Sequence, residues 1–183
     1  MTDLVWYAGY GSNLSRDRFS CYIAGGTPAG TIRTYDGCRD RTPPRRTTAL
    51  RFPGALAFAG ESTVWGGGTA FLDPGGDNEV VARAYLVTAD QLEDVAAQET
   101  RYDGVFTVGD RDGVRVVALT SSVTHEPAAP SAAYLRTLLG GLTDGLLGAD
   151  EAIAYLLAVP GVDLLWDEAT IRALAEQPTT GRS

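Results

Sequence analysis

The order of strand-like and helical patterns along the chain limits its possible folds more than any other sequence feature. All the short runs with strand character lie before residue 122, and helical patterns predominate over 131–176. Strands followed by grouped helices favour an α+β domain over a regular alternation of strand and helix. We therefore predict one α+β domain over residues 1–177 and a short flexible C-terminal tail, 178–183.

Strands are predicted where apolar and β-branched residues cluster between turn residues. Residues 25–54 are rich in Gly, Pro, Thr and Arg, and we expect long loops there around a single short strand. Three glycines interrupt one of the later runs, which indicates a bulge or a close approach of backbone at that point. The predicted strands are 4–9, 30–34, 56–59, 64–72, 80–87, 105–108 and 114–121.

Helices are predicted from apolar spacing and from capping residues. A short helix over 14–20 is expected to be capped by Ser12 or Asn13. Thr88 and Gln91 have capping-box spacing and predict a helix that runs to about residue 99. The remaining helices are expected over 131–139, 150–159 and 167–176.

The missing residue types exclude several chemistries. All 15 basic residues are arginine, so a Walker-type phosphate loop and a Schiff-base mechanism both lack their lysine. One histidine, His125, and two distant cysteines cannot form a His/Cys zinc site, and a Ser–His–Asp triad would depend on His125 alone. We expect no metal and no cofactor. Carboxylates, hydroxyls, arginines and backbone amides must then supply the chemistry.

The charge distribution bounds the possible partners. The net charge is −8, yet residues 1–60 hold eight arginines and four acids, a balance of +4, and the rest of the chain has a balance of −12. An acidic chain argues against general nucleic-acid binding. The beginning of the sequence has neither a basic region nor a long apolar stretch, so a cytoplasmic protein with no membrane partner is expected.

The segment from Tyr10 to Asn13 is a candidate anion-binding loop. A strand that ends in glycine and turns into a helix leaves several backbone N–H groups without partners, at the positive end of the helix dipole. An ordinary strand-to-helix turn with a Ser or Asn cap explains the same residues, and the pattern alone favours that alternative.

Glu99 is the candidate acid/base. It shares one helix face with Leu92, Val95 and Ala96, so its carboxylate lies where an apolar side chain is expected. Burial and the negative end of the helix dipole both raise a carboxyl pKa, which suits a group that accepts and returns a proton near neutral pH. The alternative is a carboxylate at a frayed helix end that reaches Arg101 or water.

Several other residues allow two interpretations. Tyr7 and Tyr134 are either core aromatics or ligand contacts. Five arginines surround Pro43 and Pro44 and form either a solvated loop or a patch that recognises an anionic leaving group or an acidic partner. These arginines are Arg39, Arg41, Arg45, Arg46 and Arg51.

Four segments, in sequence order, resemble those of γ-glutamylcyclotransferases. Residues 7–14 (Y-A-G-Y-G-S-N-L) are similar to the opening strand and loop of that family, and residues 65–70 (W-G-G-G-T-A) are similar to its glycine-containing strand. Residues 98–99 (Q-E) resemble a helix end whose Glu is the proposed acid/base, and residues 130–134 (P-S-A-A-Y) resemble a segment whose Tyr contacts substrate.

The resemblance implies a small mixed β-barrel flanked by helices, with the loop and the glutamate facing one cavity. It implies that Glu99 is catalytic and that the substrate is a small γ-glutamyl compound. The substrate-binding residues that it implies are Tyr7, Tyr10, Gly11, Ser12, Asn13 and Tyr134.

The reaction that the resemblance implies is cleavage of a γ-glutamyl amide by its own α-amine, which releases 5-oxoproline. Thr100 stands where the family has Gly, and the arginine-rich stretch 36–54 is longer than in typical members. A non-catalytic module that binds a γ-glutamyl compound or a carboxylate is the alternative function. A domain that docks an acidic partner through the arginine-rich loop is a third.

Overall fold

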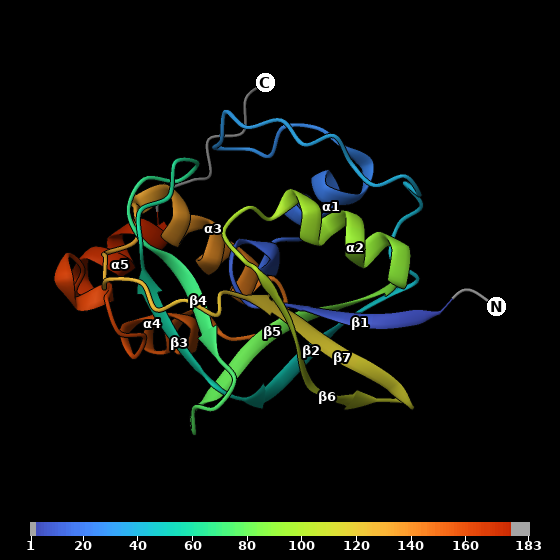
Figure 1. The fold of residues 1–183 in the computed structure, drawn as a ribbon. Helices are drawn as coiled ribbons and strands as arrows, with labels where there is room; N and C mark the ends of the chain where they lie inside the picture. Colours follow the sequence, from blue (N-terminus) through green and yellow to red (C-terminus); the bar gives the residue numbers. More distant parts are fainter. Residues whose placement is uncertain (1–2, 177–183) are drawn as a thin grey trace.

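The computed structural model describes residues 3–176, which form an α+β fold (Figure 1). The strands are β1 (Leu4–Gly9), β2 (Arg46–Pro53), β3 (Ala55–Ala59), β4 (Thr69–Asp73), β5 (Glu79–Thr88), β6 (Gly104–Arg111) and β7 (Val114–Thr120). The α-helices are α1 (Arg16–Ala24), α2 (Ala89–Gln98), α3 (Ala132–Thr143), α4 (Ala149–Leu157) and α5 (Glu168–Glu176). Two 3₁₀ turns, η1 (Ser12–Leu14) and η2 (Val162–Leu164), complete the elements.

The main sheet is mixed and has β1 at its centre. Its strand order is β2-β5-β1-β7-β6. β1 is antiparallel to β5, with Tyr7 opposite Tyr85, and parallel to β7, with Tyr7 opposite Val117. A central strand is covered on both faces, which explains why residues 4–9 form a continuous apolar run.

Alternate residues of β1 enter two different cores. Trp6 and Ala8 pack in the larger core together with α3, α4 and α5, which lie together on the left of Figure 1. Val5 and Tyr7 face the other way and pack in a smaller core beneath α1 and α2. This alternation places the tyrosine of β1 on the α1/α2 side of the sheet.

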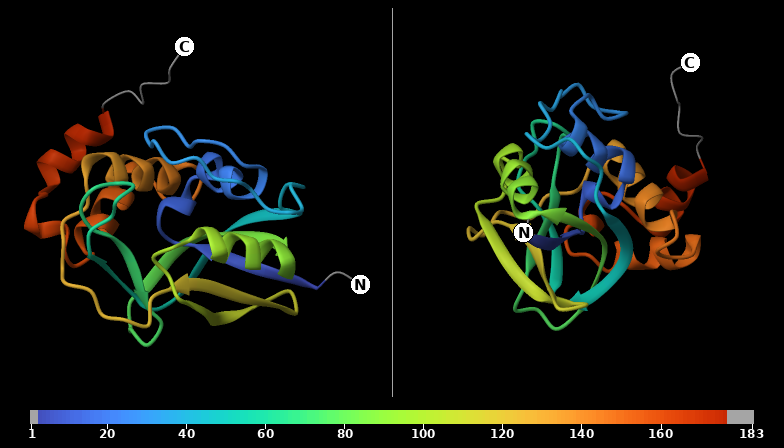
Figure 2. Two further views of the ribbon diagram at one scale, coloured as in Figure 1. Left: turned by 45° about the horizontal axis from the view of Figure 1, so that its top comes forward. Right: turned by 90° about the vertical axis from the view of Figure 1, so that its right-hand side faces the viewer.

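The sheet curls until its two edge strands approach each other, as the right-hand view of Figure 2 shows. Side chains link β2 to the end of the β6 hairpin: Arg46 pairs with Asp112 at 3.2 Å, and Arg111 donates to the carbonyl of Ala49 at 3.4 Å. Within residues 3–176, no ladder of backbone hydrogen bonds joins the edge strands β2 and β6. The mixed sheet with helices agrees with the expected fold class, and closure into a barrel stays a prediction.

The expected close backbone approach at the glycine run is present. Gly68 donates to the carbonyl of Ala129 at 2.8 Å, and Gly67 forms an isolated bridge with Pro130. A Cβ on Gly68 would collide with the carbonyl oxygen of Ala128. Only a residue without a side chain lets segment 128–130 lie against the start of β4 in this way.

Three sequence predictions of local structure are wrong. Residues 30–34 form no strand, and the expected strand 64–72 begins only at Thr69. Residues 46–53, expected as loop, form β2 along the edge of the main sheet. β2 was missed because it is an edge strand in which only Phe52 is buried, so its apolar alternation is weak.

The helices follow their predicted caps with one exception. The capping box of Thr88 and Gln91 is present at the start of α2. α1, however, begins at Arg16 and is capped by Ser15 rather than by Ser12 or Asn13. The predicted tail, 178–183, lies outside the described residues. Within 3–176 there is no helix with the length and apolarity that a membrane crossing requires.

Candidate active site

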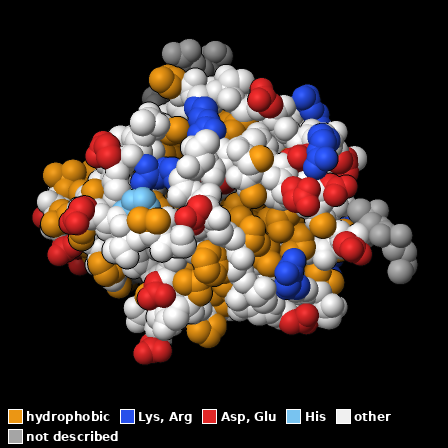
Figure 3. Space-filling view, in the orientation of Figure 1, with side chains coloured by type: hydrophobic (Ala, Val, Ile, Leu, Met, Phe, Trp, Pro, Cys, Tyr) orange, Lys and Arg blue, Asp and Glu red, His pale blue; other side chains and the backbone are white. Residues whose placement is uncertain are grey.

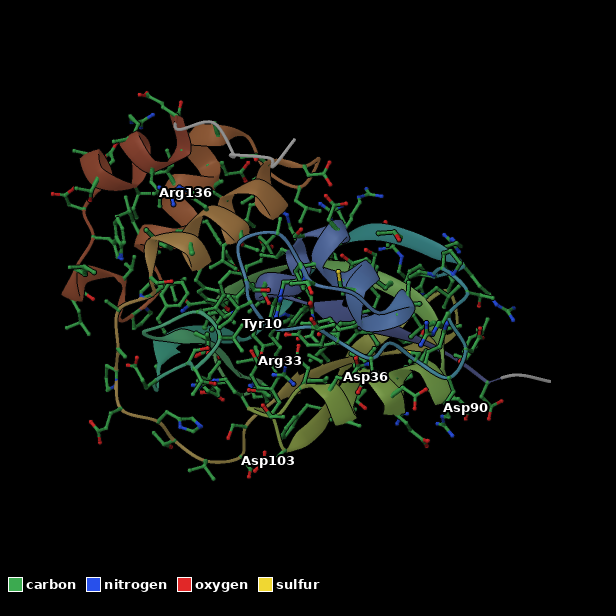
Figure 4. All side chains as sticks on the ribbon, turned by 90° about the horizontal axis from the view of Figure 1, so that it is seen from above. Tyr10, Arg33, Asp36, Asp90, Asp103 and Arg136 are labelled. Carbon is green, nitrogen blue, oxygen red and sulfur yellow. The ribbon has the colours of Figure 1, made fainter. Side chains whose placement is uncertain are left out.

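One pocket brings together all the predicted catalytic and substrate-binding residues. It lies where β1 ends, between α1, α2 and α3, and Figure 4 shows Tyr10 and Arg33 near the centre of this region. The predicted residues that line it are Tyr7, Tyr10, Gly11, Ser12, Asn13, Glu99 and Tyr134. Residues that the sequence analysis assigned to no site also line it, among them Arg18, Tyr22, Arg33, Tyr35, Trp65, Arg101 and Tyr102.

The loop after β1 directs its polar groups into this pocket. Because Ser15 caps α1, the side chains of Ser12 and Asn13 are free for other contacts. Within the described chain, the backbone N–H groups of Gly11, Ser12 and Asn13 have no hydrogen-bond acceptor. Three neighbouring donors at a helical turn form a site that favours an anion.

Glu99 is linked directly to this loop. It is the C-cap residue of α2, and its Oε1 accepts a hydrogen bond from Asn13 Nδ2 at 3.1 Å. The same amide nitrogen donates to the Tyr7 hydroxyl at 2.9 Å. Burial raises the pKa of Glu99, while hydrogen bonds from Tyr22 and Asn13 and the charge of Arg18 lower it; burial dominates.

The tyrosines around the loop are held by backbone groups. The Tyr10 hydroxyl donates to the carbonyl of Leu119 at 2.6 Å, and the Tyr102 hydroxyl donates to the carbonyl of Ala70 at 2.8 Å. The Tyr134 hydroxyl accepts from the N–H of Ala70 at 3.1 Å. Burial raises the pKa of Tyr134 to about 12, so its hydroxyl stays neutral at physiological pH.

Arg18 is a buried cation that the sequence analysis missed. Its side chain is 4% exposed and donates to Ser12 Oγ at 2.8 Å and to the Tyr35 hydroxyl at 2.6 Å. The guanidinium also lies 4.8 Å from the ring centre of Trp65. The only local signal was the i, i+4 pair of Arg18 with Tyr22 on α1, because Tyr35 and Trp65 come from distant segments.

Two further arginines lie in the pocket wall. Arg33 donates to the carbonyl of Gln98 at 2.9 Å, and its guanidinium lies 4.8 Å from the ring centre of Tyr35. Arg101 donates to the carbonyl of Glu61 and lies 5.3 Å from the ring centre of Phe71. Among residues 3–176, neither Arg33 nor Arg101 nor Arg18 pairs with a carboxylate.

Several buried polar atoms in the pocket lack a partner. Asn13 Oδ1, Arg18 Nη1 and Thr69 Oγ1 are all buried, and none has a hydrogen bond with a described residue. Buried polar groups are otherwise nearly always satisfied, so a group of such atoms in one pocket indicates a bound ligand or ordered water. The atoms comprise an acceptor, a cationic donor and a hydroxyl that can act as either.

The arginines of the predicted surface patch lie outside this pocket. Arg39 pairs with Asp94 at 2.9 Å, and Arg51 pairs with both Glu79 at 2.6 Å and Glu151 at 3.2 Å. On the face that Figure 3 draws, basic and acidic side chains also lie next to one another. Arg46 pairs with Asp112 as well, so ion pairs neutralise three of the five arginines, and the structure gives the patch no support.

His125 also lies outside the pocket. Its ring stacks on Phe71 at 4.3 Å, and its Nε2 lies 3.3 Å from Ser121 Oγ. The residues that the structure describes contain no group of three or more His, Cys, Asp or Glu side chains placed to hold a metal ion.

Comparison with solved structures identifies the fold. A structure titled γ-glutamyl cyclotransferase superposes with a TM-score of 0.62 at 18% identity, and the match covers 93% of this chain and 99% of that one. The chain has the γ-glutamylcyclotransferase-like fold. An uncharacterised protein from Homo sapiens matches with a TM-score of 0.61 at 18% identity, over 96% of this chain and 99% of the other.

A third structure shares the γ-glutamylcyclotransferase-like fold in part. YkqA from Bacillus subtilis superposes with a TM-score of 0.56 at 13% identity, and the match covers 86% of this chain and 55% of YkqA. Structural matches at identities this low show a common fold, and they do not show a common activity.

Sequence comparison gives one further relative and no family model. No protein-family model matches the chain. A protein named histone deacetylase 5 from Arabidopsis thaliana is 30% identical over 198 aligned positions, which cover 83% of this chain and 30% of that protein. The chain therefore spans under a third of this relative. Most of the protein to which that name applies lies outside the match.

Proposed function

We propose that this protein is a γ-glutamylcyclotransferase-type enzyme that releases 5-oxoproline from a γ-glutamyl amide. The observation that carries the proposal is the partly buried Glu99 carboxylate, hydrogen-bonded to Asn13 of the loop after β1 inside a pocket with unsatisfied polar atoms. The fold, shared with a solved γ-glutamyl cyclotransferase, supports the same conclusion.

The pocket offers a partner for each end of a γ-glutamyl group. The free N–H groups of Gly11 to Asn13 and the unpartnered Nη1 of Arg18 suit the α-carboxylate. Asn13 Oδ1 and the Glu99 carboxylate are acceptors, as an α-ammonium requires. Tyr7, Tyr10 and Tyr134 enclose the aliphatic part of the substrate.

Glu99 would carry out the proton transfers. The substrate α-ammonium has a pKa of about 8 or above, so at neutral pH it must lose a proton before its nitrogen can attack the γ-carbonyl. Ionised Glu99 takes this proton, and the new C–N bond closes the ring. The ring nitrogen gives up a second proton, the leaving nitrogen gains both, and Glu99 ends ionised as the amide C–N bond breaks.

Two physical effects explain the advantage of this arrangement. Nucleophile and electrophile belong to one molecule, so the protein needs only to hold the γ-glutamyl chain in a curled conformation. Burial destabilises the charged form of Glu99, so its carboxylate is a stronger base than an exposed one. Backbone N–H groups at the loop can also stabilise an oxyanion, at about 3 kcal/mol for one well-placed donor.

The proposal is tested by incubating the pure protein with a panel of γ-glutamyl amines, amino acids and peptides. Release of 5-oxoproline, followed by mass spectrometry, is the expected result. Calorimetry on the same panel distinguishes the alternative function: binding of a γ-glutamyl compound without 5-oxoproline release identifies a non-catalytic module and overturns the enzymatic proposal.

A further inference from the structure

Gln98, the last residue of α2, joins three segments that meet beside the pocket. Its amide nitrogen donates to the carbonyls of Tyr22 on α1 and Asp94 on α2, both at 3.0 Å. Its amide oxygen accepts from the N–H of Gly37, in the loop between α1 and β2, at 3.3 Å. Its backbone carbonyl accepts from Arg33 of the same loop at 2.9 Å. The end of α2 is therefore tied both to α1 and to this loop.

Gln98 is not among the residues that line the pocket, but Glu99, which follows it, is. Glu99 is the C-cap of α2, and its φ of −88° and ψ of 81° lie outside the helical region. The helix therefore no longer fixes the direction of the Glu99 side chain by itself. The carboxylate still has to meet Asn13 Nδ2, which lies 3.1 Å from its Oε1. The anchoring of the last helical residue decides whether it does.

The tie between α2 and α1 is also a tie to the loop after β1. α1 follows η1, the turn that contains Asn13, with only Ser15 between them. α1 and α2 both pack on the smaller core and lie next to each other in Figure 1. Holding the end of α2 against α1 thus fixes the distance between the acid at the end of one helix and the amide that precedes the other.

We propose that Gln98 is a positioning residue that holds the Glu99 carboxylate against Asn13 by tying the last turn of α2 to α1. This proposal rests on the proposed function and names a residue outside the pocket on which the same reaction depends. Proton transfer tolerates little displacement, since a shift of about 1 Å in a reacting group can lower the rate by about 10²-fold.

A purely structural role is the competing explanation, and α2 contains a matched control for it. The amide nitrogen of Gln91 donates to the carbonyls of Asp40 and Thr42 at 3.1 and 2.9 Å, and its oxygen accepts from the N–H of Thr88 at 3.1 Å. Gln91 therefore makes the same set of contacts as Gln98, two carbonyls and one N–H, at the opposite end of the helix. It is also the more buried of the two, at 2% exposed.

The experiment compares Gln98→Met with Gln91→Met, using the best substrate of the γ-glutamyl panel. Methionine keeps the length of the side chain and makes none of the amide hydrogen bonds. Both variants should melt roughly 2–8 °C below the parent, because each loses the same set of contacts. Only Gln98→Met should lower kcat, by about 10- to 100-fold, with KM within about threefold of the parental value, because the residues that line the pocket are unchanged.

The pH profile gives a readout that a structural role would not move. Burial raises the pKa of Glu99, and its hydrogen bonds, including the one from Asn13, lower it. Loss of the contact with Asn13 should therefore raise the pKa further. The rising part of the kcat/KM profile should move to higher pH in Gln98→Met and stay in place in Gln91→Met.

The other ionisable groups around Glu99 do not produce such a movement. The arginines that line the pocket, Arg18, Arg33 and Arg101, stay cationic throughout the assay range. Burial raises the pKa of each tyrosine that interacts electrostatically with Glu99, so these hydroxyls stay neutral. They are Tyr7, Tyr10, Tyr22, Tyr102 and Tyr134.

The outcomes are distinct. Equal kinetic losses in the two Met variants, a pH profile of Gln98→Met that does not move to higher pH, or a raised KM with unchanged kcat each overturn the positioning role and leave the proposed function intact. If Gln98→Met does not fold, Gln98→Asn and Gln91→Asn, whose amides are one methylene too short, provide the same comparison. Absence of 5-oxoproline release by the parent protein from every substrate overturns the proposed function, and the role of Gln98 with it.

Discussion

Charged side chains in the pocket are held differently from those on the outer surface. Arg18 is bound by hydroxyls and aromatic rings, and Glu99 by an amide. Outside, Arg39 and Arg51 form ion pairs with carboxylates at 2.9 and 2.6 Å. Neutral partners position a charge without cancelling it, whereas an ion pair cancels it. The number of arginines in a region therefore says less about whether it can bind an anion than the identity of their partners does.

The largest expected effect separates two glutamates, Glu93 in the middle of α2 and Glu99 at the C-terminal end of that helix. Glu99→Gln should lower the rate of 5-oxoproline release by about 10²–10⁴-fold, the range for loss of a general acid/base. Glu93→Gln, which changes an exposed carboxylate of α2, should leave the rate unchanged. Steady-state kinetics on both variants makes the measurement. A Glu99→Gln protein with the parental rate would falsify the assignment.

The next effect separates two arginines of α1. Arg18→Met removes the cation from the pocket and should reduce kcat/KM by about 10- to 100-fold, because a charged hydrogen-bond donor to the substrate is lost. Arg16→Met removes only an exposed pair with Asp144 and should have no measurable effect.

Thermal melting accompanies the Arg18 experiment. A folded Arg18→Met protein with unchanged kcat/KM would contradict the claim that charges in the pocket, unlike those on the surface, bind the substrate. If Arg18→Met does not fold, binding of a γ-glutamyl substrate to Arg18→Lys, measured by calorimetry, provides the same comparison. Arg18→Lys keeps the charge but loses the planar donor fork, so we expect weaker binding than in the parent.

A third comparison concerns stability. Arg83 is 1% exposed and donates to the carbonyls of Leu14, Gly141 and Asp144 at 2.7, 2.9 and 2.7 Å, so it ties the loop after β1 to the end of α3. It also pairs with the half-exposed Asp144 carboxylate at 3.1 Å. Arg83→Met should reduce the free energy of unfolding by about 3 kcal/mol, because three carbonyls lose their donor. That corresponds to a melting temperature roughly 6–12 °C lower.

The control for Arg83 is an arginine of β2. Arg46→Met breaks an exposed pair with Asp112 and should leave the melting temperature unchanged. Equal losses of stability in the two variants, measured by chemical denaturation, would contradict the view that the buried contacts of Arg83 stabilise the fold more than an exposed ion pair does.

The smallest expected effect is a pH-dependent gain in stability. Burial raises the pKa of Glu99 in the folded protein above its unfolded value of 4.5, so folding disfavours the ionised form. The stabilising contribution of the protonated carboxyl is fully present below pH 4.5 and is lost as the pH rises through the folded pKa.

Glu99→Gln should therefore melt at a higher temperature than the parent at pH 8, by roughly 2–4 °C for each 1 kcal/mol, and the difference should shrink towards pH 4. Calorimetric melting at a series of pH values gives the curve. A constant difference, or a less stable Glu99→Gln protein at pH 8, would show that the carboxylate is not destabilised by burial.

The sequence predicted those parts of the molecule whose determinants are local. β1 was readable as a continuous apolar run, and the start of α2 from the Thr88 and Gln91 capping box, which is present. The loop after β1 and Glu99 were selected from their own positions on these elements, and the structure places them 3.1 Å apart through Asn13.

The missed features depend on contacts between distant segments. β2 pairs with β5 along its whole length, but its exposed face hides the apolar pattern. Arg18 is an ordinary helix residue until Tyr35 and Trp65 fold around it. Arg33 and Arg101 likewise line the same pocket only because two separate segments of the chain meet there. No local pattern carries that information.

The pH dependence of 5-oxoproline release tests the central claim most directly. Because kcat/KM reports the ionisation of the free enzyme, and because the base must be ionised, kcat/KM should rise with pH through the raised pKa of Glu99, above the ordinary carboxyl value of 4.5. The residual activity of Glu99→Gln should lack this rise. A kcat/KM that stays constant between pH 4.5 and 7, or an identical rise in Glu99→Gln, would contradict the role of Glu99 as the proton-transferring group.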